Sequence, residues 1–215
     1  MRVMHVDASP KRMHSSSKML SAHFIQQLRQ GIADIKVDYM DTSLNPPSHI
    51  DHAFIEAMYT PASARSNEMQ QTLAYSDQLC ARVLMSDMLV FAMPMYNFSM
   101  PSGFKALIDN LVRPGLTYTI NNDGISGNLS RQKVLFITTR GADLRPGISP
   151  WAHMDALTPA LKSAFSFIGA DHPEFVDVQP LENNDVIART EILDEACLHL
   201  SVIAHTWTHH AVLSI

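Results

Sequence analysis

Cysteine is scarce in this chain, and a run of basic residues is missing altogether. The two cysteines, Cys80 and Cys197, fall among apolar neighbours in segments with helical spacing, which favours reduced thiols in the core over a disulfide framework. Charged residues make up 17% of the chain and the net charge is -5, so the basic surface that nucleic acid requires is not present. We therefore expect a cytoplasmic protein without a nucleic-acid partner.

Long hydrophobic runs are missing too, as are the usual glycine motifs. No apolar run approaches the ~20 residues that a transmembrane helix needs, and the first ten residues lack the apolar region and cleavage site of a signal peptide. We therefore expect no membrane association. Neither G-x-G-x-x-G after the first strand nor G-x-x-x-x-G-K-[ST] occurs, which excludes the common dinucleotide and Walker-type cradles. No G-x-S-x-G elbow supports a hydrolase.

What the chain does have is a regular alternation of apolar runs with segments of helical spacing. A hydrophobic content of 46% over 215 residues supports one packed domain, residues 1–215. The alternation predicts an α/β fold with a five-stranded parallel sheet and helices on both faces. We expect the order 2-1-3-4-5, which is one of the common orders of such open sheets. The predicted strands are residues 2–8, 35–40, 88–92, 133–139 and 174–178. A turn signal at residues 121–124 predicts a small hairpin within an excursion at residues 112–131.

The loop after the first predicted strand is rich in hydroxyl groups and cations. It contains Ser9, Lys11, Arg12, His14, Ser15, Ser16 and Ser17. Hydroxyls and free N–H groups at the N-terminus of a helix predict a phosphate site. The alternative is that the serines only cap the helix, which needs no ligand.

The loops after the third and fourth predicted strands lie at the same edge of such a sheet. The third-strand loop contains Met95, Tyr96, Asn97 and Phe98, and the fourth-strand loop contains Thr139, Arg140, Gly141 and Ala142. Aromatic rings beside amide groups suit a flat heterocycle with polar edges, Gly141 allows close backbone approach, and Arg140 could favour a reduced, anionic ring. The alternatives are a turn whose aromatics fill the core and a solvated turn.

The closing helix carries histidines at 199, 205, 209 and 210, of which His205 and His209 have i,i+4 spacing. A zinc site needs three or four ligands, and no cysteine or carboxylate lies suitably close in the sequence. We therefore expect no metal.

Segments along nearly the whole chain resemble, in order and spacing, the FMN-dependent NADH azoreductases of the flavodoxin-like quinone reductase superfamily. These segments are residues 94–101, 107–118, 138–141 and 165–169, together with the start at residues 7–9 and the serines at 15 and 17. The resemblance implies an enzyme that binds FMN and transfers hydride by a ping-pong route from NADH or NADPH to a quinone or an azo compound. It implies no catalytic residue from the protein, because the flavin N5 carries the chemistry.

The resemblance also implies a role for each loop. Ser9, Ser15, Ser16 and Ser17 would hold the FMN phosphate, Met95, Tyr96, Asn97 and Phe98 would line the isoalloxazine, and Thr139, Arg140, Gly141 and Ala142 would contact its pyrimidine side. A homodimer with two active sites at its interface is implied as well, with Tyr118, Ile120 and Phe167 helping to form the substrate pocket.

Three positions depart from the family pattern: Ala142 would narrow the approach to the ring, and Ile120 and Leu144 bear on the range of acceptors. Ala142 stands where relatives often have glycine, Ile120 where many have an aromatic residue, and Leu144 where some have histidine. The same loops would also serve a flavin-binding electron carrier or a redox-responsive interaction protein without turnover. The excursion at residues 112–131 favours the enzyme, because a carrier can leave its flavin edge exposed.

Overall fold

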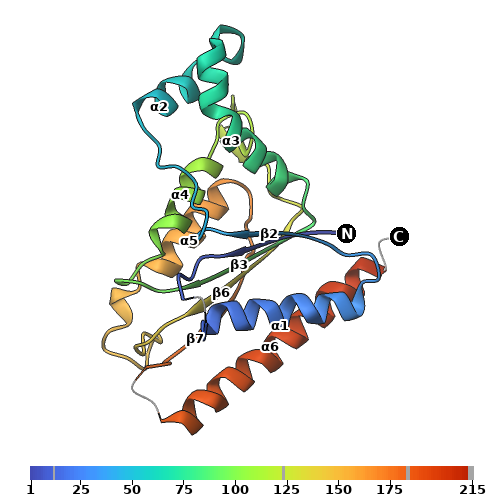
Figure 1. The fold of residues 1–215 in the computed structure, drawn as a ribbon, viewed down its shortest axis with the longest axis vertical. Helices are drawn as coiled ribbons and strands as arrows, with labels where there is room; N and C mark the ends of the chain where they lie inside the picture. The colour runs from blue at the N-terminus through green and yellow to red at the C-terminus, as the bar shows by residue number, and fades with distance from the viewer. Residues whose placement is uncertain (12, 123, 183–184, 213–215) are drawn as a thin grey trace.

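Five parallel strands form the centre of the molecule in the computed structural model, which describes residues 1–11, 13–122, 124–182 and 185–212 (Figure 1). The strands are β1 (Arg2–Asp7), β2 (Lys36–Asp41), β3 (Met88–Pro94), β6 (Lys133–Thr139) and β7 (Glu174–Val178). They pair in the order β2-β1-β3-β6-β7, and every pair is parallel. The predicted sheet and strand order are confirmed.

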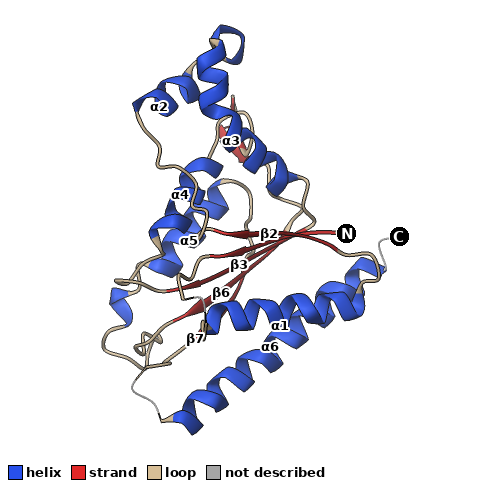
Figure 2. Cartoon of the chain, viewed as in Figure 1, coloured by secondary structure: helices blue, strands red, loops and turns tan. Residues whose placement is uncertain are grey.

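Helices cover both faces of this sheet, as predicted (Figure 2). One face carries α1 (Ser16–Gly31) and α6 (Val186–Val212), and the other carries α3 (Asn67–Leu84), α4 (Ser102–Leu111) and α5 (Leu157–Phe167). Successive side chains of a strand point to opposite faces. Accordingly Val90 of β3 packs in the cluster with α1 and α6, and Phe91 packs in the cluster with α3, α4 and α5.

Helix α1 shows how the local sequence fixes one of these elements. The Ser15 hydroxyl accepts a hydrogen bond from the Lys18 N–H and caps the helix at its start. Leu20, Phe24 and Leu28 then form one fully buried stripe, and the helix packs along α6. The cap therefore begins the helix directly after the β1 loop, where the phosphate site is predicted.

A helical arm projects from the body of the molecule (Figure 1). It consists of α2 (His52–Tyr59), a short 3₁₀ turn at Ala62–Ala64 and the first part of α3, with a small core of its own that includes Phe54 and Leu73. Arg113, after α4, is buried, pairs with Asp77 of α3 at 2.8 Å and lies over the Phe54 ring. This arginine joins the arm to the helices that cover the sheet.

The excursion after α4 forms the predicted hairpin. Strands β4 (Tyr118–Asn121) and β5 (Gly124–Gly127) pair antiparallel, while Asp123 of the turn lies outside the described residues. The hairpin lies against the end of α5, where the Leu129 N–H donates to the Ile168 carbonyl at 2.9 Å. Gly127 passes so close that a Cβ there would meet the Gly169 nitrogen at 2.0 Å.

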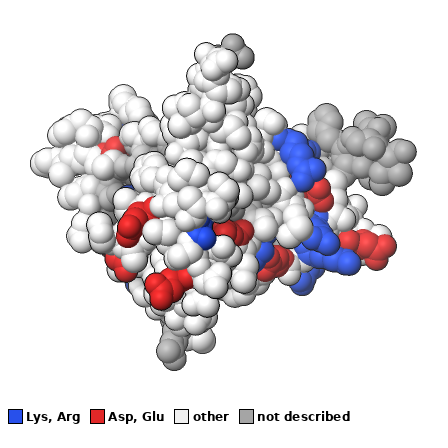
Figure 3. Space-filling view, turned by 90° about the horizontal axis from the view of Figure 1, so that it is seen from above, with Lys and Arg blue, Asp and Glu red and all other residues white. Residues whose placement is uncertain are grey.

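On the face shown in Figure 3, Lys and Arg side chains gather along one edge beside carboxylates, and most of the remaining face carries no charged side chain. No helix in the described part of the chain has both the length and the apolar character to cross a membrane. Cys80 and Cys197 are both free, and burial raises the pKa of the Cys80 thiol to about 11.

The close approach at Gly127 gives a stability test. Gly127→Ala places a methyl group against backbone that cannot move aside locally, so we expect it to destabilise the fold by about 1–3 kcal/mol. That loss lowers the melting temperature by roughly 3–10 °C for a chain of this size. Ser126→Ala, at the exposed neighbouring position, is the control and is expected to change little. Equal melting temperatures for the two variants would show that the hairpin yields at this contact.

Candidate functional site

The loops after β1, β3 and β6 meet at the carboxyl edge of the sheet around a pocket of about 90 Å³. Eight of the residues that the sequence predicts for the cofactor line it: Ser9, Ser15, Ser16, Met95, Tyr96, Thr139, Arg140 and Gly141. Parallel pairing of β3 with both β1 and β6 produces this convergence, because the three strands end at the same edge. The pocket joins segments more than 130 residues apart in the chain.

The serine loop forms one end of the pocket. Ser9 and Ser16 line it, and the Ser9 hydroxyl accepts the Lys11 N–H at 3.4 Å. Ser15 lines the pocket and also caps α1. It therefore caps the helix, as the alternative interpretation expects, and is part of the site as well. Ser17 is 1% exposed, lies 3.3 Å from the Ser15 hydroxyl and does not line the pocket. Arg12 lies outside the described residues.

The β3 loop contains a tight two-residue turn. Tyr96 and Ser99 exchange backbone hydrogen bonds of 2.9 and 3.0 Å, and between them Asn97 and Phe98 have φ values of 47° and 67°. Left-handed geometry at both central residues is that of a type I′ turn, which Asn tolerates and a bulky residue does not. Asn97 lines an adjoining groove together with Tyr96. The Phe98 ring is 43% exposed and lines neither this pocket nor the adjoining groove.

The Arg140 guanidinium does not act as the free cation that the sequence suggests. Its side chain is 1% exposed and pairs with Asp155 and Asp177, each at 3.0 Å, while the Thr158 hydroxyl accepts a further hydrogen bond at 2.6 Å. The two carboxylates neutralise its charge, so the predicted preference for an anionic ring does not follow from this side chain. Arg140 instead ties the end of β6 to β7 and to the start of α5, and its buried Nε has no partner among the described residues.

Three lining residues were missed in the sequence: Leu181, Glu182 and Arg189. They come from the segment after β7 and from the start of α6, where the pattern indicates only a loop and a helix. Arg189 donates to the Ser16 hydroxyl at 2.8 Å and to the Leu181 carbonyl at 2.7 Å. The Glu182 carboxylate lies beside Gly141, where a Cβ would be 2.6 Å from its oxygen. Only the packing of α6 against α1 brings Arg189 to the serines.

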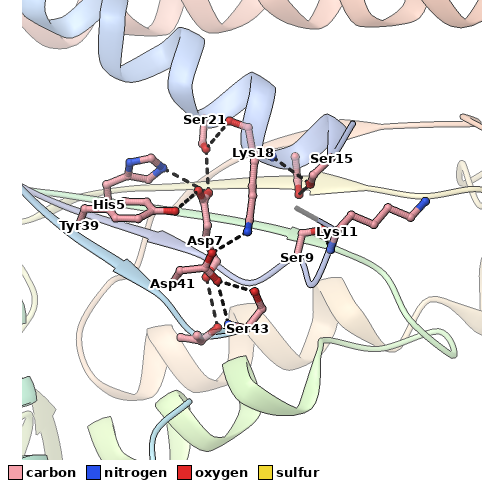
Figure 4. Close-up of polar contacts among 12 residues, drawn as sticks. His5, Asp7, Ser9, Lys11, Ser15, Lys18, Ser21, Tyr39, Asp41 and Ser43 are labelled. Carbon is pink, nitrogen blue, oxygen red and sulfur yellow. Dashed lines mark hydrogen bonds and ion pairs between the residues drawn. The ribbon is translucent and has the colours of Figure 1, made fainter. Parts of the chain in front are cut away.

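Two buried carboxylates lie beneath the serine loop, at the ends of β1 and β2 (Figure 4). Asp7 accepts from the Ser21 hydroxyl at 2.8 Å and from the Tyr39 hydroxyl at 3.0 Å, and His5 Nε2 lies 3.3 Å away. Burial and the Asp7 charge raise the pKa of Tyr39, which keeps its proton on the hydroxyl. These contacts fix the end of β1 directly before Ser9.

Asp41 forms the second half of this network. Lys18 Nζ pairs with its carboxylate at 2.6 Å, and the Ser43 hydroxyl and N–H donate to it at 2.6 and 2.9 Å (Figure 4). Burial by itself would raise the pKa of Asp41, but the hydrogen bonds from Lys18 and Ser43 outweigh it and hold the pKa below its usual range. Lys18, on the first turn of α1, is therefore already neutralised by a carboxylate.

The residues predicted for the substrate lie outside this pocket in the single chain. Tyr118 and Phe167 contact each other with ring centroids 4.8 Å apart, and Ile120 is 70% exposed on the hairpin. Ala142 is exposed and does not line the pocket, whereas Leu144 is 3% exposed, so its side chain is covered by the chain itself.

Across the described residues, no three His, Cys, Asp or Glu side chains come together in a way that could hold a metal ion. His205 and His209 lie together, with their Nε2 atoms 2.8 Å apart. His210 lies outside the residues whose side chains are described.

The fold and the three-loop pocket define a flavodoxin-type α/β protein, and comparison with known proteins agrees. A family model described as the flavodoxin-like fold matches residues 1–201, and the chain belongs to this family. An FMN-dependent NADH:quinone oxidoreductase of Nostoc punctiforme is 34% identical over 194 residues, 90% of this chain and 93% of that protein. An FMN-dependent NADH:quinone oxidoreductase 1 of Trichormus variabilis is 36% identical over 181 residues, 84% and 85% of the two chains.

Solved structures are similar in fold at lower identity. A crystal structure of an FMN-dependent NADH-azoreductase from Bacillus anthracis in complex with FMN has a TM-score of 0.85 and 20% identity, covering 97% of this chain and 100% of that chain. An azoreductase structure from another strain of the same species has a TM-score of 0.87 at 20% identity, covering 96% and 99%. These likenesses confirm the flavodoxin-like fold.

The turn at Phe98 allows its backbone strain to be measured. We expect Phe98→Gly to be more stable than Phe98→Ala by about 1 kcal/mol, because both remove the ring but only glycine adopts a positive φ without strain. Chemical unfolding of the two variants measures this difference. Alanine as stable as glycine would mean that the loop relaxes to a negative φ at this position.

Asp41 gives a pH dependence. Its folded-state pKa is depressed, so its contribution to stability is complete above the unfolded value of about 4 and is lost as the pH falls further. We expect Asp41→Asn to lower the free energy of unfolding at pH 7 by about 1–3 kcal/mol. Between pH 6 and pH 3, the free energy of unfolding of this variant is expected to fall less than that of the native protein. Asp34→Asn, at an exposed position, is the control. Parallel pH profiles for the native protein and D41N would contradict this assignment.

Proposed function

We propose that this protein is an FMN-dependent NAD(P)H oxidoreductase that reduces quinones, azo compounds or both. The observation that carries the proposal is the convergence of the serine, aromatic and glycine loops on one pocket, in a chain 34–36% identical to enzymes named for FMN-dependent NADH:quinone oxidation and reduction. We propose further that each chain forms a single domain and that the protein works in the cytoplasm as a homodimer.

The groups at the pocket suit FMN. Hydroxyls and N–H groups at the start of α1 are donors for a phosphate. At the other end, Thr139, Arg140 and Gly141 line the pocket, and the buried Nε of Arg140, which has no partner among the described residues, is the kind of donor that a bound acceptor satisfies. An anionic group at one end and a polar-edged ring at the other match this distribution.

In the proposed complex each loop has its own task. Ser9, Ser15 and Ser16 bind the phosphate, and Ser17 supports Ser15 from behind. Met95, Tyr96, Asn97 and Phe98 line the isoalloxazine, and the segment Thr139, Arg140, Gly141 and Ala142 contacts its pyrimidine side. When bound, FMN supplies a ring that accepts hydride from NADH or NADPH and passes the electrons to the acceptor. The protein then needs no general acid of its own, and water can supply protons.

The acceptor and the second subunit belong together in this proposal. Exposed apolar side chains on the hairpin, on the β3 loop and at the end of α5 are suited to cover a partner's pocket: Ile120, Phe98 and Phe167, with Tyr118 behind Phe167. Because Ile120 replaces an aromatic residue, it offers a flat acceptor less stacking surface. Leu144 is buried in its own chain, so its substitution for histidine acts on packing before it acts on the acceptor.

Purified protein reconstituted with FMN tests the function. We expect a yellow protein that oxidises NADH or NADPH when menadione or methyl red is added. Double-reciprocal plots of the initial rate, with nucleotide and acceptor both varied, are expected to give the parallel lines of a ping-pong mechanism. A yellow protein without turnover of either acceptor would favour a flavin-binding electron carrier or redox-responsive interaction protein. A colourless protein that cannot be reconstituted would exclude both.

A further inference from the structure

Most of the cations around the pocket are already compensated or exposed. Arg140 is neutralised by Asp155 and Asp177, and Lys18 by Asp41. Lys11 and His14 line the pocket but are exposed. Among the described cations that the sequence places there, those that line the pocket without an ion pair are therefore exposed to water, which screens their charge.

Arg189 differs from all of these. It is partly buried and lines the pocket, and no carboxylate in the described part of the chain forms an ion pair with it. Glu182 is the pocket's carboxylate, and it lies beside Gly141 instead. An arginine with only neutral partners, a hydroxyl and a carbonyl, keeps its full charge in a place that water only partly reaches.

The position of Arg189 also determines which group it meets. Its Nη2 donates to the Ser16 hydroxyl at 2.8 Å, so the guanidinium lies directly at the N-terminus of α1. Its Nη1 donates to the Leu181 carbonyl at 2.7 Å, which holds the side chain in this direction. A planar guanidinium fixed beside serine hydroxyls and a helix N-terminus is well suited to a phosphate, whose oxygens it can bind in pairs.

We propose that Arg189 is the counter-charge for the phosphate of bound FMN and that it makes the pocket prefer FMN to riboflavin. This inference rests on the proposed function and adds a fourth segment, the start of α6, to the three loops. Arg189 both binds the phosphate and orients the Ser16 hydroxyl toward it. FMN binding then also links α6 to the β1 loop through a charged contact.

Titration of the apoprotein with FMN and with riboflavin, followed by flavin fluorescence, tests the role of Arg189. We expect Arg189→Met to weaken FMN binding by about 10- to 100-fold, because a charge-assisted contact to phosphate is lost, and to leave riboflavin affinity within about twofold. Arg189→Lys keeps the charge without the paired donors, so its affinity for FMN is expected to lie between those of the native protein and R189M. Ser16→Ala removes the hydroxyl but keeps the arginine, and it is expected to weaken FMN binding less than R189M does.

Arg82→Met is the matched control, because Arg82 is an arginine on α3 whose ion pair with Asp38 lies outside the pocket. It is expected to leave both affinities unchanged, and melting temperatures of the apoproteins check folding. A native preference for FMN that survives in R189M, or an equal loss for both flavins, would overturn the role of Arg189. Native protein that binds neither flavin would instead overturn the proposed function.

Discussion

The parallel pairing of β3 with both β1 and β6 is the constraint on which the rest of the structure depends. Parallel strands end at one edge and need helical crossovers, so the three loops that follow them must share that edge. Because α1 and α6 both cover the same face, the start of α6 reaches the start of α1. The pocket is thus a consequence of topology before any one side chain shapes it.

Buried charge is the second organising feature. Arg113 and Arg140 are each 1% exposed in their side chains. Asp77 compensates Arg113, and Asp155 and Asp177 compensate Arg140. Removing either partner would leave a charge in a poorly solvated place, so these pairs fix how the arm, the sheet and α5 lie relative to one another. The Asp7 and Asp41 networks do the same beneath the serine loop. Arg189 stands apart because no carboxylate in the described part of the chain pairs with it.

Among the described residues, the non-glycine residues with a positive φ are His14, Asn97 and Phe98, and all three lie in the loops that form the site. Phe98 has a positive φ that its side chain does not favour, and the hydrogen bonds between Tyr96 and Ser99 maintain it. A turn of this kind is rigid, so Tyr96, which lines the pocket at the start of the turn, is held in place before a ring binds. Binding a flat ligand then costs less ordering of the chain.

The sequence by itself determined the five strands, the helices, the hairpin and the loops that supply eight of the pocket-lining residues, because periodicity and loop composition are local properties. The strand order followed from the common order of such sheets and not from periodicity. Tertiary structure decided which of the arginines at the site are neutralised by carboxylates. Arg140 looks like a free cation in the sequence, but Asp155 and Asp177 neutralise it, while Arg189 lies in an ordinary helical stretch and reaches the serines across 173 residues. Whether an ion is free depends on neighbours brought together by folding, and periodicity carries no record of them.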